Sequence, residues 1–224
     1  MENDQFVIYP HPANSEPQPD LDPKDKLVYV AIRRYMNSRT MEAFPSYATI
    51  TKDTGAAAKT IKKCVDNLIR EGYIETRRRG KYLIYKFNNN KRFEPYSYDF
   101  LDNPNLTFTE KSYIVASHQY MFKDGNEGKI QYSNKELSVL IHMPVSTISD
   151  CNKSLEAKGY LEGASEFIKR FPQDKLNLIF IEKFKEQDER MDNIEDEVRM
   201  LREELARLKK ERELERNVNT QMIL

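Results

Sequence analysis

Two clusters of basic side chains carry the clearest chemistry in this chain. The first consists of Lys59, Lys62 and Lys63, and the second is the run Arg77-Arg78-Arg79 with Lys81 close behind it. Ammonium and guanidinium groups bind phosphate oxygens, and a guanidinium can do so through two parallel hydrogen bonds. The two clusters therefore predict a surface that faces a polyanion. The alternative for the arginine run is a solvated basic turn.

The charge of the chain is unevenly distributed. The 224 residues include 36 lysines and arginines and 36 acidic residues, so the net charge is zero. Residues 21–95 hold 17 of the basic residues against 8 acidic ones, whereas residues 1–20 hold four acidic residues and no basic one. This asymmetry indicates one polyanion-facing module in an otherwise mildly acidic protein.

The pattern around the first basic cluster occurs twice. Residues 26–75 and 111–162 each predict an apolar helix, a short helix, a longer helix and a Gly-Tyr step into a strand. The matched pairs include Tyr35-Met36 with Tyr120-Met121, Ser46 with Ser133, Cys64 with Cys151, and Gly72-Tyr73 with Gly159-Tyr160. The offset is 85 residues for the first pair and 87 for the others, so one two-residue insertion distinguishes the copies. Each copy is expected to be a folding unit.

Caps and turns place the elements of each copy. Ser46 opens the short helix and Gly55 closes it, because serine accepts from free backbone N–H groups and glycine adopts the left-handed turn. The longest helix is expected at 57–71. Strands are predicted at 73–76 and 82–87, with the arginine run in the turn between them. In the second copy the strands are predicted at 160–168 and 175–182.

The stretch Gly55-Ala56-Ala57-Ala58-Lys59-Thr60-Ile61, followed by Val65, Leu68 and Gly72-Tyr73-Ile74, resembles the winged helix-turn-helix DNA-binding proteins of bacteria, phages and plasmids. The resemblance implies an α+β fold, mostly helical, with two tandem winged-helix domains. It also implies transcription regulation, with plasmid or phage replication initiation as the alternative. A third possibility is a winged-helix protein-interaction adaptor that does not bind DNA.

An α-helix fits the major groove of double-stranded DNA, where its side chains can read base edges. For the first copy we expect DNA contacts from Ser46, Tyr47, Thr49, Lys59, Thr60, Lys62, Lys63, Asn67, Arg77, Arg78, Arg79 and Lys81. The second copy departs from this pattern, since Asp150 replaces Lys63 and Asn152 replaces Val65. It either adds DNA contacts, or it helps dimerisation or positions the first copy with little DNA contact of its own. Its candidate contacts are Ser146, Thr147, Ser149, Asn152 and Lys153.

The C-terminal segment has the apolar period of a coiled coil. Seam positions recur in steps of three and four residues from Phe184, and the flanking charges at the g and e positions are opposite in sign. This pattern predicts a parallel homodimer with its interface at Met191, Ile194, Val198, Leu201, Leu205 and Leu208. The alternative is a single amphipathic helix that folds back on its own domains.

The predicted organisation has four parts. A flexible N-terminal arm at 1–23 precedes a basic winged-helix domain at 24–95, a second winged-helix domain at 96–183 and a coiled-coil dimerisation helix at 184–224. The arm is rich in proline and poor in apolar residues, although Phe6-Val7-Ile8-Tyr9 could add a strand. Residues 88–106 are predicted to be the inter-domain linker.

No enzyme chemistry is predicted. His11, His118 and His142 lack metal-ligand spacing with each other or with the cysteines, and no phosphate loop or serine-nucleophile motif occurs. We therefore expect no cofactor, metal or small-molecule ligand. Two cysteines at equivalent repeat positions and the lack of an apolar run of membrane length predict a cytoplasmic protein without membrane contact.

Overall fold

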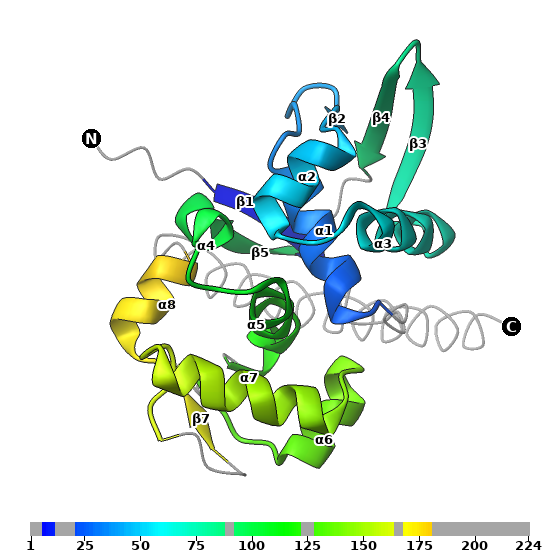
Figure 1. Ribbon diagram of the computed structural model, residues 1–224. Coiled ribbons are helices and arrows are strands. Elements are labelled where there is room, and N and C mark those ends of the chain that lie inside the picture. Colours follow the sequence, from blue (N-terminus) through cyan, green and yellow to red (C-terminus); the bar gives the residue numbers. More distant parts are fainter. Residues whose placement is uncertain (1–5, 12–20, 88–91, 122–127, 164–167, 181–224) are drawn as a thin grey trace, which may run out of the picture. The chain divides into compact units, whose positions relative to one another are not determined.

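The computed structural model describes residues 6–11, 21–87, 92–121, 128–163 and 168–180 (Figure 1). These residues belong to one compact unit that spans positions 1–181. The predicted coiled coil at 184–224 lies outside the described residues, together with its seam from Met191 to Leu208. The same holds for residues 12–20 of the predicted N-terminal arm.

Three helices form the first copy of the repeat. They are α1 (Pro23–Arg33), α2 (Tyr47–Thr54) and α3 (Ala58–Arg70). The predicted caps of α2 are confirmed: the Ser46 hydroxyl accepts from the Thr49 backbone N–H at 3.1 Å, and Gly55 has φ 74°. Helix α3 is shorter than the predicted 57–71 by one residue at each end.

A small antiparallel sheet follows α3, in the strand order β2-β4-β3. It consists of β2 (Glu42–Ala43), β3 (Ile74–Arg79) and β4 (Tyr82–Phe87), and the hairpin of β3 and β4 extends away from the helices (Figure 1). Arg79 pairs with Tyr82, so the turn is only Gly80 and Lys81. The placement of the arginine run in the turn was therefore wrong. A two-residue hairpin loop with positive φ at Gly80 suffices, and the arginines extend the strand.

A second antiparallel pair joins the beginning of the chain to the predicted linker. Strand β1 (Phe6–His11) pairs with β5 (Arg92–Ser97), and the helix α4 (Tyr98–Asp102) follows directly. The strand alternative for residues 6–9 is confirmed, and the prediction of a flexible arm is wrong for residues 6–11. The linker prediction is likewise wrong for residues 92–102, because pairing with β1 gives this backbone hydrogen-bond partners that the local sequence does not reveal.

The second copy repeats the helical pair of the first. Helix α5 (Phe108–Met121) is followed by α6 (Asn134–Ile141) and α7 (Val145–Ala157). Both ends of α6 and α7 lie 87 residues after those of α2 and α3. Ser133 caps α6 as Ser46 caps α2, and His142 adopts the left-handed conformation of Gly55, with φ 54°. The predicted repeat therefore holds in the backbone, down to the turn between the two helices.

The predicted strands of the second copy are wrong. Strand β7 (Lys169–Arg170) pairs with β6 (Lys129–Ile130), Glu162 makes one isolated bridge, and residues 173–179 form the helix α8 (Gln173–Ile179). Pro172 precedes α8 directly, and proline is well tolerated at a helix start. Leu176 and Ile179, three residues apart, are both buried. A helix buries this apolar spacing on one side, whereas a strand would split it between its faces.

Helices α1 and α5 hold equivalent places in the two copies and pack against each other. Consequently α1 is buried on almost all sides, with Leu27, Val30 and Ile32 fully inaccessible to solvent. The buried apolar residues of both copies form one cluster. The two copies therefore share a single core.

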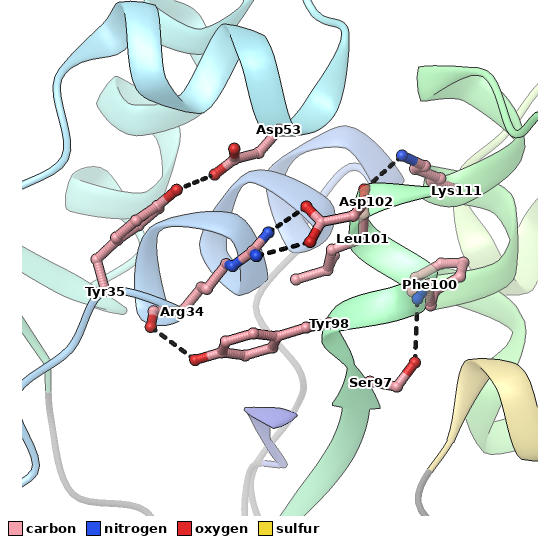
Figure 2. Close-up of polar contacts among 9 residues, drawn as sticks. All are labelled: Arg34, Tyr35, Asp53, Ser97, Tyr98, Phe100, Leu101, Asp102 and Lys111. Atoms are coloured by element: carbon pink, nitrogen blue, oxygen red, sulfur yellow. Dashed lines mark hydrogen bonds and ion pairs between the residues drawn. The ribbon is translucent and has the colours of Figure 1, made fainter. Parts of the chain in front are cut away.

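A polar junction between α1 and α4 borders this shared core (Figure 2). The Arg34 guanidinium donates twice to the Asp102 carboxylate, once at 2.7 Å, and lies 4.4 Å from the centre of the Tyr98 ring. The Tyr98 hydroxyl returns a hydrogen bond to the Arg34 carbonyl at 3.0 Å. The Arg34 hydrogen bonds lower the pKa of Asp102. The bidentate ion pair of Arg34 and Asp102 fixes the direction of the chain as it enters the second copy.

A substitution at Gly128 tests the packing of the second copy. Its φ is +70°, and a Cβ there would lie 2.5 Å from Leu176 Cδ1 and 3.0 Å from the Phe171 carbonyl oxygen. Gly128→Ala is expected to lower the free energy of unfolding by about 2 kcal/mol, measured by urea denaturation. Gly163→Ala is the control, because Gly163 also has positive φ but no atom within 4 Å of the added Cβ. Equal losses in the two variants would contradict the packing described here.

Candidate nucleic-acid interface

Helix α3 has one buried side and one basic side. Ile61, Cys64, Val65 and Leu68 are buried in the core. The ammonium groups of Lys59, Lys62 and Lys63 are exposed, as predicted, and Thr60 is half-buried. Lys62 makes an ion pair with Asp66 one turn along the helix, at 3.1 Å. An exposed pair of this kind contributes little stability, so Lys62 can exchange this partner for a phosphate.

The start of α2 borders this basic side. The hydroxyls of Ser46 and Thr49 lie 2.9 Å apart, and Ser46 also caps the helix. Both hydroxyls therefore stabilise the fold, although both residues also reach the surface. Tyr47 is half-buried beside them. Burial raises the pKa of Tyr47, and Lys62 and Arg78 oppose this shift electrostatically. Tyr47 therefore lies within the electrostatic reach of one cation from α3 and one from β3.

The three arginines of β3 do not act as one group. Side chains alternate along a strand, so Arg78 shares the face of Thr76, and Arg77 and Arg79 share the opposite face. Arg77 donates to Glu42 of β2 at 2.8 Å. Neither Arg78 nor Arg79 makes an ion pair with the described residues. At the tip of the hairpin, the Lys81 ammonium lies 5.4 Å from the Tyr82 ring. Arg78 thus lies on the same face of β3 as Ile74, which is buried in the core.

Asn67 was predicted to contact DNA, and the structure gives it another role. Its Nδ2 donates to the Asp25 carboxylate at 3.1 Å, and its Oδ1 accepts from Arg70 at 3.0 Å. Both ends of the amide therefore have partners within the domain, which disfavours a base contact from Asn67, and that contact stays a prediction. The side chain anchors the end of α3 to the start of α1.

In the second copy, one predicted contact residue, Asn152, also has its partners inside the fold. Asn152 is only 5% exposed, accepts from the Tyr113 hydroxyl at 2.8 Å and donates to Asn134 at 3.2 Å. These bonds satisfy its amide inside the fold, so it seats α7 rather than reading a base. Ser146 and Lys153 are exposed, whereas Thr147 and Ser149 are half-buried.

The equivalent surfaces of the two copies differ in chemistry. Val139, Leu140 and Val145 are exposed apolar residues around the turn between α6 and α7. Lys52, Asp53 and Ala58 hold the matching positions of the first copy. Ser146, Ser149 and Asp150 replace the three lysines of α3. The second copy therefore keeps the helical scaffold without its concentration of positive charge.

A buried acid at the start of each first helix holds the following long helix, a feature that we did not predict. Asp25, 2% exposed, binds Asn67, and Glu110, 3% exposed, binds Lys158 at 2.7 and 2.8 Å. Burial raises the pKa of Asp25. Burial also acts to raise the pKa of Glu110, but hydrogen bonds from Lys158 and Ser154 outweigh it and lower that pKa. The signal in the sequence is an acid at equivalent positions, 85 residues apart.

Residues 20–74 match the model of a helix-turn-helix domain. This segment contains α1, α2 and α3, which carry the basic side described above. No curated protein matches the chain in sequence. In the part of the chain that the structure describes, no helix is both long and apolar enough to cross a membrane. The protein therefore has a mixed α and β fold with a helix-turn-helix domain, and that domain indicates DNA binding.

The two buried acids predict opposite effects of charge removal. Because the pKa of Asp25 is raised on folding, its contribution to stability is fully present below about pH 4 and is lost as the pH rises through its folded-state pKa. Asp25→Asn keeps an acceptor for Asn67 and removes this loss. We expect it to raise the free energy of unfolding at pH 7, and we expect the gain to vanish in acid, as measured by urea denaturation across pH.

Glu110→Gln is the matched variant. The lowered pKa of Glu110 means that its contribution is present at neutral pH and is lost as the pH falls. Removing this partner of Lys158 is expected to cost about 2 kcal/mol at pH 7 and less in acid. If both variants change stability in the same direction at pH 7, the contrast between the two sites is wrong.

Proposed function

We propose that this protein is a sequence-specific double-stranded DNA-binding protein that regulates transcription as a homodimer. The observation that carries the proposal is the row of exposed lysines along α3, Lys59, Lys62 and Lys63, in the segment that matches a helix-turn-helix domain. A recognition helix and a neighbouring hairpin with cations on one side suit a duplex, because the helix fits the major groove and the hairpin reaches the adjacent backbone.

The placement of charge further favours a duplex. The free cations gather on α3 and its neighbours, while the rest of the chain is neutral or acidic. Phosphate contacts would position the domain, and Lys59, Thr60 and Lys63 would face the base edges. Ala57 and Ala58 leave the beginning of α3 unobstructed. The proposal is of a cytoplasmic binding protein, not an enzyme, and it requires no cofactor.

The dimer rests on the heptad pattern of residues 184–224. Two parallel copies would place two equivalent basic helices about a two-fold axis, so the target would be an inverted repeat. The second copy of the repeat would then support the first more than it contacts DNA. Its apolar residues Val139, Leu140 and Val145 instead favour a protein partner, which keeps the adaptor alternative open for this half of the chain.

Replication initiation is the second candidate function. The helix-turn-helix segment and the repeat of its helical pair in α6 and α7 support it equally, since an origin-binding protein and an operator-binding protein use the same kind of interface. Selection of bound fragments from the source genome separates the two, because origin fragments and promoter fragments differ in their location. Recovery of no fragment at moderate salt, with a folded protein, would overturn DNA binding and leave the adaptor function.

The arginines of β3 give a quantitative test of the interface. Arg78→Ala is expected to lower the slope of log K against log salt by about 0.9, the value for one phosphate contact. Arg77→Ala should change it less, because Glu42 competes for this guanidinium. Fluorescence anisotropy with a selected duplex between 50 and 200 mM salt, as an order-of-magnitude range, measures both. An effect of Arg77→Ala that exceeds that of Arg78→Ala would remove Arg78 from the interface.

The homodimer has its own test. Light scattering at micromolar concentration is expected to give twice the chain mass of 26.5 kDa. Replacing Ile194 and Leu201 with glutamate puts charges into the seam and should give the single-chain mass, because apolar seam residues drive the pairing. A monomeric wild type would disprove the coiled coil without affecting DNA binding by the first copy.

A further inference from the structure

A groove of about 580 Å³ lies between the start of α1 and the basic side of α3. Lys24 lies on its α1 wall, and Lys59 and Lys63 lie on its α3 wall. The groove thus extends the basic surface of α3 onto a second element. The charge pattern of the sequence did not single out Lys24, because it stands 35 residues before Lys59.

The charged groups of this groove differ in whether they already have a partner. Asp66 is paired with Lys62, and Asp25 is buried beneath the surface against Asn67. The Asp22 carboxylate accepts the backbone N–H of Lys24 at 3.0 Å as the cap of α1. Lys24, Lys59 and Lys63 make no ion pair with any residue that the structure describes. Three ammonium groups without an ion-pair partner among the described residues therefore face carboxylates that already have partners. This arrangement suits the binding of an anion.

Helix α3 has cations along both of its flanks. Lys59 and Lys63, one turn apart, border the groove with Lys24. Lys62 also lines this groove. The hairpin of β3 and β4, which carries Arg78, lies on the other side of α3 from the start of α1 (Figure 1). A helix inserted in the major groove has one DNA strand on each side of it. Lys24 and Arg78 are therefore placed for different strands.

We propose that Lys24 is a further DNA-contact residue, which binds a backbone phosphate of the strand opposite to the one bound by Arg78. This inference rests on the proposed function and specifies how the two strands are held. The contact comes from the ammonium group and not from the end of α1. The backbone N–H groups of Lys24, Asp25 and Lys26 are all taken by Asp22, and Pro23 has none.

Salt dependence tests the contact on a duplex that the wild-type protein selects from a random-sequence pool. Lys24→Ala is expected to lower the slope of log K against log salt by about 0.9 and to weaken binding about five- to tenfold at 0.1 M salt. The control is Lys52→Ala. Lys52 is exposed near Asp102 at the junction of α1 and α4, and it does not border the groove. The control should bind as the wild type does.

Ethylation interference on the same duplex tests the assignment to strands. The wild type should show sensitive phosphates on both strands, Lys24→Ala should lose those on one strand, and Arg78→Ala should lose those on the other. Loss from the same strand in both variants, or a Lys24→Ala variant equal to the wild type in slope and pattern, overturns the inference. A wild type that selects no duplex overturns the proposed function itself, so the two failures are distinguishable.

Discussion

The burial of α1 on nearly every side is the constraint on which the rest of the structure depends. One side of this helix seats α2 and α3, and another packs against α5 of the second copy. A helix with only 11 residues therefore belongs to the cores of both copies at once. Any tilt of α1 would move α3, and with it the basic surface, relative to the second copy. Polar contacts at both ends oppose such a tilt, through Asp25 at its start and Arg34 at its end.

Local signals predicted the helical parts of this fold well. The caps Ser46 and Gly55 and the repeat of Cys64 as Cys151 follow from short-range chemistry, so the sequence alone located α2, α3, α6 and α7. The pairing of β1 with β5 joins residues that are 81 to 91 positions apart, from His11 with Arg92 to Phe6 with Ser97, and no local pattern encodes this partnership. The prediction of a strand at 175–182 was wrong for a related reason. Leu176, Leu178 and Phe180 alternate as in a strand, whereas Leu176 and Ile179 have the spacing of a helix, and only the surrounding core decides between the two patterns.

The candidate interface shows the same division. The exposure of the lysines on α3 could be predicted, because the apolar residues recur at helical spacing and the lysines fall between them. Asn67 and Asn152 could not be assigned, since an asparagine can serve the fold or the ligand. Their partners, Asp25 and Tyr113, lie on a different helix in each case. Lys24 was not among the predicted contacts, because only the packing of α1 on α3 brings it beside Lys59 and Lys63.

The difference between the copies bears on the need for a dimer. Both copies retain the serine cap, the left-handed turn and the buried acid that holds the long helix, so the scaffold is constrained in each. The surface of α7 is not similarly constrained, and Asp150 there would repel a phosphate that Lys63 attracts on α3. A single chain therefore offers one basic helix of this kind. In the proposed function, a two-fold symmetric DNA site requires two such helices, and a second copy of the chain is the simplest way to provide the other.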